Sequence, residues 1–301
     1  MKVLITGSSG LIGSALAPFL AAKGDTVIRL VRPVSRPAAD QLVWDPLADR
    51  LDAALLEGFE GVVHLAGENI GTSRWTPSVK SRLRDSRVKG TRLLAETLVR
   101  LAHPPGVLVS ASAIGYYGDR GDEVLTEDSP PGTGFLPETC REWEAAAQLA
   151  AAQGIRVVNL RSGMILAATG GALARMLPPF KLGVGGVVGS GRQYVSWITL
   201  DDVIAAVHHA LTDERLRGAV NAVAPAAVTN REFTNVLGHV LHRPTLLPAP
   251  AFALRLALGE LADALLLASS RVSPARLQAT GFAFGFPDLE GALRHVLGKE
   301  H

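Results

Sequence analysis

Three glycines close to the start of the chain have a spacing that suits the binding of phosphate groups. They lie between an apolar run, Lys2–Ile5, and a helical pattern, Leu11–Lys23. At this spacing the first glycine makes a tight turn, the second lets the backbone approach a pyrophosphate, and the third lets helix and strand pack closely. The helix N-terminus adds free N–H groups and a positive dipole end. We therefore predict that a dinucleotide is bound by Gly7, Ser8, Ser9, Gly10, Leu11, Ile12 and Gly13; the alternative is a glycine-rich turn without a ligand.

The end of the next predicted strand, Thr26–Val31, indicates which dinucleotide binds. NAD(H) sites usually place Asp or Glu there to bond the ribose hydroxyls, whereas NADP(H) sites avoid that charge and use an arginine for the 2′-phosphate. Arg32 lies at the strand end, and no carboxylate follows until Asp40. We predict that Arg32 binds the 2′-phosphate and that the cofactor is NADP(H). The alternative is an ordinary solvated arginine.

A third group of candidate residues follows the predicted strand Val62–Leu65. Ligands of an open α/β sheet bind beyond the carboxyl ends of the strands, so this loop has to face the cofactor. We expect cofactor contacts from Leu65, Ala66, Gly67 and Glu68, and a substrate contact from Asn69. His64 ends a buried run, and we expect it to be a structural hydrogen-bonding residue rather than a base.

The elements that position these groups follow from the alternation of short apolar runs with longer helical patterns. The runs predict strands at Lys2–Ile5, Thr26–Val31, Val62–Leu65, Val107–Ser110 and Arg156–Leu160. Helical periodicity covers Leu11–Lys23, Lys80–Leu101 and Pro137–Gln153. Alternating strands and helices predict an α/β fold, a doubly wound parallel Rossmann sheet.

The pattern changes from about residue 170 onward. We expect a helix from Gly170 to Leu182, a strand at Tyr194–Thr199, a helix at Asp201–Leu211, a strand at Ala219–Val223, and only helices after Pro225. This predicts an NADP-binding Rossmann domain over residues 1–165 and 195–225, with a small, mainly helical substrate or cap region over 166–194 and 226–301. The apolar stretch Phe252–Ala268 is expected to pack in the core, with a lid or a dimer helix as alternatives.

Composition sets limits on the partners and the compartment. The chain has 48% apolar and 19% charged residues and a formal charge of +2, without a dense Lys/Arg cluster, so we expect neither nucleic acid nor a membrane as partner. No run reaches the ~18 apolar residues of a membrane span. The single cysteine, Cys140, excludes an internal disulfide and fits a reducing compartment. We expect a cytoplasmic monomer or homodimer without a metal site.

Taken together, the motifs resemble the extended branch of the short-chain dehydrogenase/reductase superfamily. The resemblance rests on Thr6-Gly7-x-x-Gly10-x-x-Gly13, His64-Leu65-Ala66-Gly67, Val88-x-Gly90-Thr91 and Ser196-Trp197-Ile198-x-x-Asp201-Asp202-Val203. A narrower likeness, to the atypical YfcH-like epimerase-family proteins, rests on Trp44-Asp45-Pro46, Arg74-Trp75, Gly115-Tyr116-Tyr117-Gly118, Arg271-Val272-x-Pro274 and Gly281-Phe282-x-Phe284. It covers essentially the whole chain and implies NADP(H) binding and the C-terminal domain of that subgroup.

The resemblance also implies a catalytic Tyr-x-x-x-Lys pair on the helix after the fifth strand, with a serine on the strand-end loop. At that spacing this chain has Cys140 and Glu144, which cannot do the usual work because a buried thiol beside a carboxylate holds its proton more tightly. Ser112, one step past the predicted strand end, is the expected serine. As the acid/base we predict Tyr116 or Tyr117. The alternatives are that Tyr117 is a wall of the substrate pocket and that Cys140 and Glu144 form the pair.

Polar residues of the second half are candidates for binding substrate. Arg192 and Tyr194 precede Ser196-Trp197, where extended relatives place substrate contacts, and they indicate an anionic or sugar-like ligand; ordinary surface residues are the alternative. We expect an NADP(H)-dependent oxidoreductase or epimerase acting on a small carbonyl or sugar-like substrate. The missing Tyr-x-x-x-Lys pair keeps a second hypothesis open, a non-catalytic NADP(H)-binding sensor or assembly factor. A third is isomerisation with a permanently held cofactor.

Overall fold

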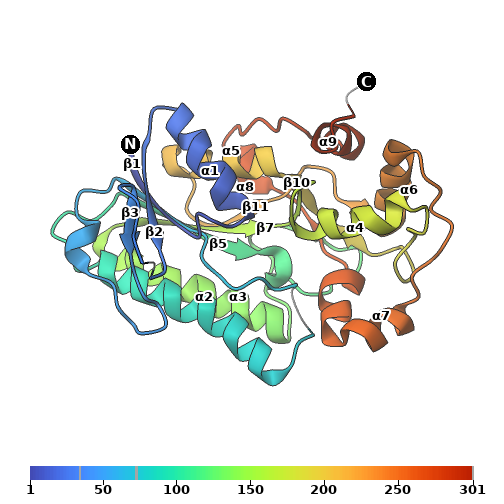
Figure 1. The fold of residues 1–301 in the computed structure, drawn as a ribbon, viewed down its shortest axis with the longest axis horizontal. Helices are drawn as coiled ribbons and strands as arrows, with labels where there is room; N and C mark the ends of the chain where they lie inside the picture. The colour runs from blue at the N-terminus through green and yellow to red at the C-terminus, as the bar shows by residue number, and fades with distance from the viewer. Residues whose placement is uncertain (34, 72–73, 300–301) are drawn as a thin grey trace.

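The centre of the molecule is a parallel sheet that crosses the middle of Figure 1. The computed structural model describes residues 1–33, 35–71 and 74–299. Within these residues the sheet has seven strands, in the order β11 (Gly218–Ala222), β7 (Arg156–Ser162), β5 (Val107–Ala113), β4 (Gly61–His64), β1 (Lys2–Thr6), β2 (Thr26–Val31) and β3 (Gln41–Val43). The predicted doubly wound parallel sheet is confirmed.

Helices cover both faces of this sheet. Helices α1 (Leu11–Ala22) and α5 (Leu200–Thr212) lie on one face, and α2 (Pro77–Leu98) and α3 (Phe135–Gln148) lie on the other (Figure 1). Each pair of helices packs on the strands through a separate apolar core, because successive residues of a strand point to opposite faces of the sheet. The sheet is therefore held rigidly from both sides.

Polar side chains mark the carboxyl edge of the sheet. In the strand register Thr6 pairs with His64, His64 with Ser110, and Ser110 with Asn159, and all four residues are buried. The His64 ring lies between two hydroxyls, with Nδ1 2.8 Å from Thr6 Oγ1 and Nε2 2.9 Å from Thr91 Oγ1. Burial lowers the pKa of His64 to about 4, so the ring is neutral at pH 7. His64 is thus a structural residue, as expected.

The order in which strands are added to the sheet reverses at β1. Strand β2 lies on one side of β1 and β4 on the other, so the connections after β1 and β4 diverge at the carboxyl edge. Such a point opens a crevice between the two loops, and ligands of open α/β sheets bind there. The glycine segment after β1 and the loop after β4 both border it.

Most of the remaining elements gather beyond the carboxyl edge, whereas α8 (Ala275–Ala279) lies against β11, with Leu277 in the same core as α1 and α5. Helices α4 (Gly171–Lys181), α6 (Asn230–Leu241) and α9 (Leu289–Val296) share a third core. The other helices are α7 (Ala251–Leu258) and a helical turn at Ala262–Leu267. The short strands are β6 (Val124–Leu125), β8 (Met164–Leu166), β9 (Tyr194–Val195), β10 (Trp197–Thr199), β12 (Val228–Thr229) and β13 (Arg271–Val272). The C-terminal part is small and mainly helical, as predicted.

Several local predictions about the second half were wrong. The expected strand Tyr194–Thr199 is broken at Ser196, whose hydroxyl donates to the Ser270 carbonyl and accepts from the Val272 N–H at 2.8 and 2.9 Å. Strands β12 and β13 follow Pro225, where only helices were expected. Two-residue strands carry no readable periodicity, which explains why they were missed. The division into a cofactor domain and a cap stays a prediction, and residues 300 and 301 of the predicted cap lie outside the described part.

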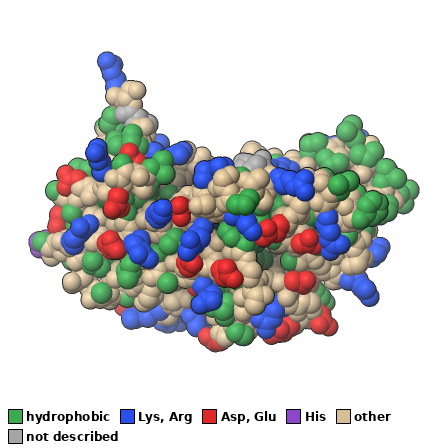
Figure 2. All heavy atoms as spheres, turned by 90° about the horizontal axis from the view of Figure 1, so that it is seen from below, with side chains coloured by type: hydrophobic (Ala, Val, Ile, Leu, Met, Phe, Trp, Pro, Cys, Tyr) green, Lys and Arg blue, Asp and Glu red, His purple; other side chains and the backbone are tan. Residues whose placement is uncertain are grey.

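The apolar stretch Phe252–Ala268 packs in the core only in part, because Leu261 and Ala262 are buried but helix α7 is not. No residue of α7 is buried, and Phe252 and Leu256 are 73% and 78% exposed. Figure 2 shows hydrophobic side chains gathered at one end of the molecule, the end where α7 lies, whereas opposite charges are mixed over the rest of that face. None of the helices in the described ranges has the length and apolar character to cross a bilayer.

Candidate functional site

The glycine segment after β1 has a backbone that other residues could not adopt. Gly7 has a φ of +66°, and a Cβ atom placed on it would lie 2.6 Å from the carbonyl carbon of Leu65. A Cβ atom on Gly13 would collide with the Gly7 carbonyl oxygen. The Gly10 N–H donates to that same oxygen at 3.0 Å. The segment is a tight turn pressed against the loop that follows β4.

This turn leaves the N-terminus of α1 open. The first helical hydrogen bond runs from the Ser14 N–H to the Gly10 carbonyl at 2.9 Å, and no side chain caps the helix at Gly10. The N–H groups of Leu11, Ile12 and Gly13 therefore have no partner within the described residues. Three free donors and a positive dipole end suit a phosphate.

Positive charge without a counterion lies at the end of β2. Arg32 is exposed and makes no hydrogen bond or ion pair with any described residue. The first carboxylate after Arg32 along the chain, Asp40, is paired with Arg29 at 2.7 Å, and this arginine lowers the pKa of Asp40. Arg32 is therefore available to an anionic group bound next to β2.

The loop after β4 is fixed to its surroundings mainly by its backbone. The N–H groups of Leu65 and Ala66 lie 3.1 and 3.2 Å from Thr6 Oγ1, and Arg87 donates to the Glu68 carbonyl at 2.9 Å. Arg87 is held in turn by the Leu83 carbonyl at 2.9 Å, and burial lowers its pKa. The residues from Leu65 to Glu68 thus form one wall of the crevice beside the glycine turn.

Two side chains of this loop are already engaged. The Glu68 carboxylate pairs with Arg82 at 3.3 Å, so we expect contacts of Glu68 with a ligand to come from its backbone. Asn69 is exposed, and its Oδ1 accepts from the Gly71 N–H at 3.0 Å. Gly67 is exposed, and a Cβ atom there would contact Arg87.

At the carboxyl end of β5, the predicted serine belongs to a buried ionic cluster. Ser112 lies within β5 rather than past its end, and it pairs with Arg161 of β7 in the strand register. Both side chains point toward α3, where Glu144 accepts two bonds of 2.8 Å from Arg161 and one of 2.7 Å from Ser112. The side chains of Arg161 and Glu144 are 4% and 13% exposed. We call Ser112, Glu144 and Arg161 the β5–α3 cluster.

The charges of this cluster stabilise each other. Burial alone would lower the pKa of Arg161, but the hydrogen bonds and the negative charge of Glu144 reverse that effect and raise it. The buried guanidinium therefore keeps its charge, and the two bonds from it to the Glu144 carboxylate give that charge the partner that a buried ion requires. Arg161 was not singled out from the sequence, although a charged residue in the apolar run of β7 was a visible signal.

The two tyrosines of the loop after β5 have different environments. Tyr117 is completely buried, and its hydroxyl donates to Asn221 Oδ1 at 2.7 Å and accepts from Arg161 at 2.9 Å. Burial raises the pKa of Tyr117. Tyr116 is half-buried, and the centre of its ring lies 3.4 Å from the guanidinium carbon of Arg161. Its hydroxyl has no partner among the described residues. Tyr116 is the tyrosine with a free hydroxyl.

Cys140 has a buried thiol that is not bonded to the β5–α3 cluster. Its Sγ lies 3.8 Å from the Ala113 carbonyl oxygen, and the Glu144 carboxylate is bonded to Arg161 and Ser112 rather than to this thiol. Burial, together with the charge of Glu144, raises the pKa of Cys140 to about 12. The thiol thus keeps its proton, and the alternative of a Cys140–Glu144 acid/base pair loses its physical basis.

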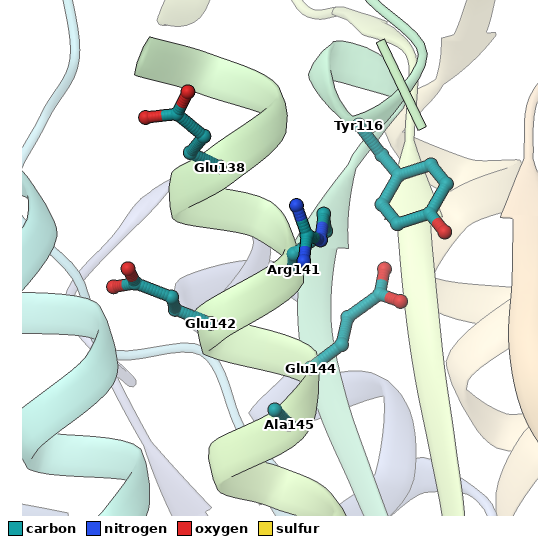
Figure 3. A pocket seen from close by; sticks show the side chains of 6 residues that line it. All are labelled: Tyr116, Glu138, Arg141, Glu142, Glu144 and Ala145. Carbon is teal, nitrogen blue, oxygen red and sulfur yellow. The ribbon is translucent and has the colours of Figure 1, made fainter. Parts of the chain in front are cut away.

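An open hollow of about 370 Å³ lies on the outer side of the β5–α3 cluster. Figure 3 shows Tyr116 and Glu144 on the same side of α3, with Glu138 and Glu142 pointing to the other side. The hollow is lined by Tyr116, Glu138, Arg141, Glu142, Glu144 and Ala145. One face of the Glu144 side chain is therefore reached from solvent.

Arg192 and Tyr194, the predicted substrate residues, lie in the C-terminal half of the structure. Arg192 is exposed, and its backbone N–H donates to Ser190 Oγ at 3.2 Å. Tyr194 is half-buried, and the guanidinium carbon of Arg271 lies 4.9 Å from the centre of its ring. The contact with Arg271 connects Tyr194 to the C-terminal segment, whereas the contact of Arg192 is local, and neither contact reaches the β5–α3 cluster.

A comparison with family models decides the relationship of the chain. Residues 3–222 match the NAD dependent epimerase/dehydratase family. The chain belongs to this family. Residues 249–296 match a second model, a domain of unknown function (DUF1731), in agreement with the C-terminal domain predicted from the sequence.

Relatives of this epimerase family are similar over the whole chain. An epimerase family protein of Mycobacterium leprae is 43% identical over 98% of this chain and 95% of its own length. Human epimerase family protein SDR39U1 is 36% identical over 99% of this chain and 100% of its own length. A crystal structure of human SDR39U1 with NADPH has a TM-score of 0.91 at 35% identity and covers 99% of both chains. More distant epimerases, such as the UDP-N-acetylglucosamine 4-epimerase of Bacillus cereus at 19% identity and a TM-score of 0.76, share the fold.

Proposed function

We propose that the protein binds NADP(H) and acts as an oxidoreductase or epimerase on a small carbonyl or sugar-like substrate. The observation that carries the proposal is the open N-terminus of α1 after β1, together with Arg32 at the end of the neighbouring strand β2, which has no partner among the described residues. The pyrophosphate would bind at Ser8, Ser9 and the free N–H groups after Gly10, and the 2′-phosphate would bind at Arg32. The NADPH in the structure of human SDR39U1 supports this assignment.

The bound cofactor would supply or accept a hydride, and the protein would have to place the substrate and move a proton. We infer that the nicotinamide end would lie beyond the carboxyl ends of β4 and β5, between the loop after β4 and the β5–α3 cluster. Ser112 and Tyr116 are the groups that we assign to the substrate hydroxyl or carbonyl. Asn69, Arg192 and Tyr194 are our candidates for holding the rest of the substrate. Tyr117 receives no proton-transfer role because its hydroxyl is fully buried and already bonded to Asn221 and Arg161. Cys140 receives none because its buried thiol keeps its proton.

The cofactor assignment is tested by titrating the purified protein with NADPH and NADH and following nicotinamide fluorescence. Replacing Arg32 with alanine should weaken NADPH binding about 10- to 150-fold, the equivalent of losing a charged hydrogen bond worth about 1.5–3 kcal/mol, and should leave NADH binding unchanged. Arg92→Ala removes another exposed arginine, on α2, and should change neither affinity. Equal NADPH binding by wild type and Arg32→Ala would overturn the assignment.

A second candidate function is binding of NADP(H) without turnover, as a sensor or assembly factor. The observation that favours it is the presence of Cys140 and Glu144 at the Tyr-x-x-x-Lys spacing. Two panels separate the two functions: carbonyl compounds with deuterium-labelled NADPH, and sugar alcohols that carry deuterium on the carbinol carbon with NADP⁺. Deuterium transferred between substrate and cofactor in either panel supports the enzyme, and absence of transfer in both supports the binding protein.

We also propose that the protein is cytoplasmic, as a monomer or homodimer. The single cysteine supports a reducing compartment, since the sequence makes no use of disulfides.

A further inference from the structure

The hydrogen bond between Ser112 and Glu144 has a defined direction. Glu144 accepts two bonds from Arg161, so it is a carboxylate and has no proton to give. In the 2.7 Å contact, Ser112 Oγ must therefore be the donor. Once its proton points at Glu144, the serine oxygen has lone pairs left and no hydrogen to offer. At its free side Ser112 can accept a hydrogen bond but cannot donate one.

This direction differs from the role that a serine has when it polarises a carbonyl, because that role requires a donor. A group that donates to Ser112 has to carry a proton, as an alcohol does. In its resting state the site is thus complementary to the hydroxyl form of a substrate.

Glu144 can also return a proton to water. Its Oε1 is bonded to Ser112, and the same side chain lines the open hollow together with Tyr116, on the same side of α3. The side chain is 13% exposed, so the carboxylate joins a buried hydroxyl at the edge of the sheet to bulk solvent. Arg161 fixes the carboxylate by two bonds and prevents it from rotating away from Ser112.

We propose that Ser112 and Glu144 form the proton relay of this protein, in place of the missing tyrosine and lysine, and that Arg161 is its positioning residue. The proposal rests on the oxidoreductase function proposed above. In oxidation, the substrate O–H proton passes to Ser112 Oγ as the serine proton passes to Glu144, and the C–O bond becomes a carbonyl. The C–H hydrogen would leave with its electron pair as a hydride, for which an oxidised nicotinamide bound in the crevice would be the acceptor. In reduction every proton moves in the opposite direction.

The hydrogen bond itself is tested without turnover, by infrared spectroscopy of the full-length protein labelled with ¹³C in the glutamate carboxylates. Ser112→Ala should shift one carboxylate stretching band, because Glu144 loses its neutral donor, and Glu144→Gln should remove that band. Ser110→Ala is the matched control. Its hydroxyl is buried in the same strand and bonds to the Ala111 carbonyl at 3.4 Å, so the spectrum should stay unchanged. An unchanged spectrum in Ser112→Ala would overturn the proposal.

The relay is tested kinetically on whichever alcohol or carbonyl of the two panels is turned over. Ser112→Ala and Glu144→Gln should each lower kcat about 100-fold or more, and the double variant should be no slower than the slower single variant. In mixtures of H₂O and D₂O, a plot of the wild-type rate against the deuterium fraction of the solvent should be curved, because two protons move in the same step. The plot for Ser112→Ala should be straight. NADPH affinity should stay within twofold in Ser112→Ala.

The two proposals fail in different ways. Turnover at the wild-type rate in Ser112→Ala overturns the relay and leaves the oxidoreductase function intact. Absence of turnover across both panels overturns both, even when NADPH binds. Ser112→Ala keeps the Arg161–Glu144 pair, so it decides the question even if Glu144→Gln does not fold.

Discussion

Arg161 is the residue on which the geometry of the candidate site depends most directly. Its guanidinium binds the Glu144 carboxylate twice, donates to the Tyr117 hydroxyl and lies against the Tyr116 ring. It therefore holds one side chain from α3 and two from the loop after β5. An arginine is suited to this role because its five donors have a fixed planar arrangement.

Removing this guanidinium should destabilise the fold, because Glu144 would remain as a largely buried, unpaired carboxylate. For Arg161→Met we expect a loss of about 3 kcal/mol in the free energy of unfolding, measured by urea denaturation. The double variant Arg161→Met/Glu144→Leu removes both charges and should recover at least half of that loss. If the double variant is less stable than Arg161→Met, the buried charge is not the cause of the loss.

Among the helices and strands, those with long periodic patterns could be predicted from the sequence. The strands at residues 26–31 and 156–162 and helix α1 were placed within two residues, and the glycine segment was assigned to the turn between β1 and α1. The contact of Glu144 with Arg161 could not be predicted. It joins a helix to a strand across a turn of unknown geometry, and no spacing rule describes such a pair. The burial of Tyr117 was missed for the same reason, since its partner Asn221 is 104 residues away.

Helix α7 shows how an apolar pattern can mislead. Its sequence was expected to be core, yet Phe252 and Leu256 face outward. Because these side chains are already in contact with water, Phe252→Ser and Leu256→Ser should change the free energy of unfolding by less than about 0.5 kcal/mol, measured by urea denaturation. Leu237→Ser on α6, where the side chain is fully buried, should cost several times more. A large loss in Phe252→Ser would mean that α7 is covered in solution.

The molecule as a whole should become less stable in acid, because one fully buried and two partly buried histidines have lowered pKa values. The pKa of His64 is lowered to about 4 by burial, and burial also lowers the pKa values of His208 and His209. Between pH 6.5 and 4 the unfolded chain binds protons at these rings that the native state does not bind. Stability therefore falls as the pH drops through that window, and His64 contributes no pH dependence above it.

This acid effect can be assigned to His64 by urea denaturation at pH 7.5, 5.5 and 4.5. We expect wild type to lose roughly 3 kcal/mol through this group between pH 7.5 and 4, and His64→Gln to show a clearly smaller slope. His103→Gln is the control, since the side chain of His103 is 87% exposed. Identical slopes in wild type and His64→Gln would show that His64 does not contribute to the acid effect.

The joint between β6 and β13 has a consequence for the order in which the protein matures. The loop that begins at Tyr116 and Tyr117 is held by residues 269–273. Ser270 donates to the Gly118 carbonyl at 2.9 Å, and Arg271 and Val272 pair with Val124 and Leu125. A ribosome makes these partners about 150 residues after the loop itself, at roughly 5–20 residues per second. The glycine segment after β1 can therefore fold early on a nascent chain. The loop that begins at Tyr116 cannot pair with residues 269–273 until these are synthesised, many seconds later.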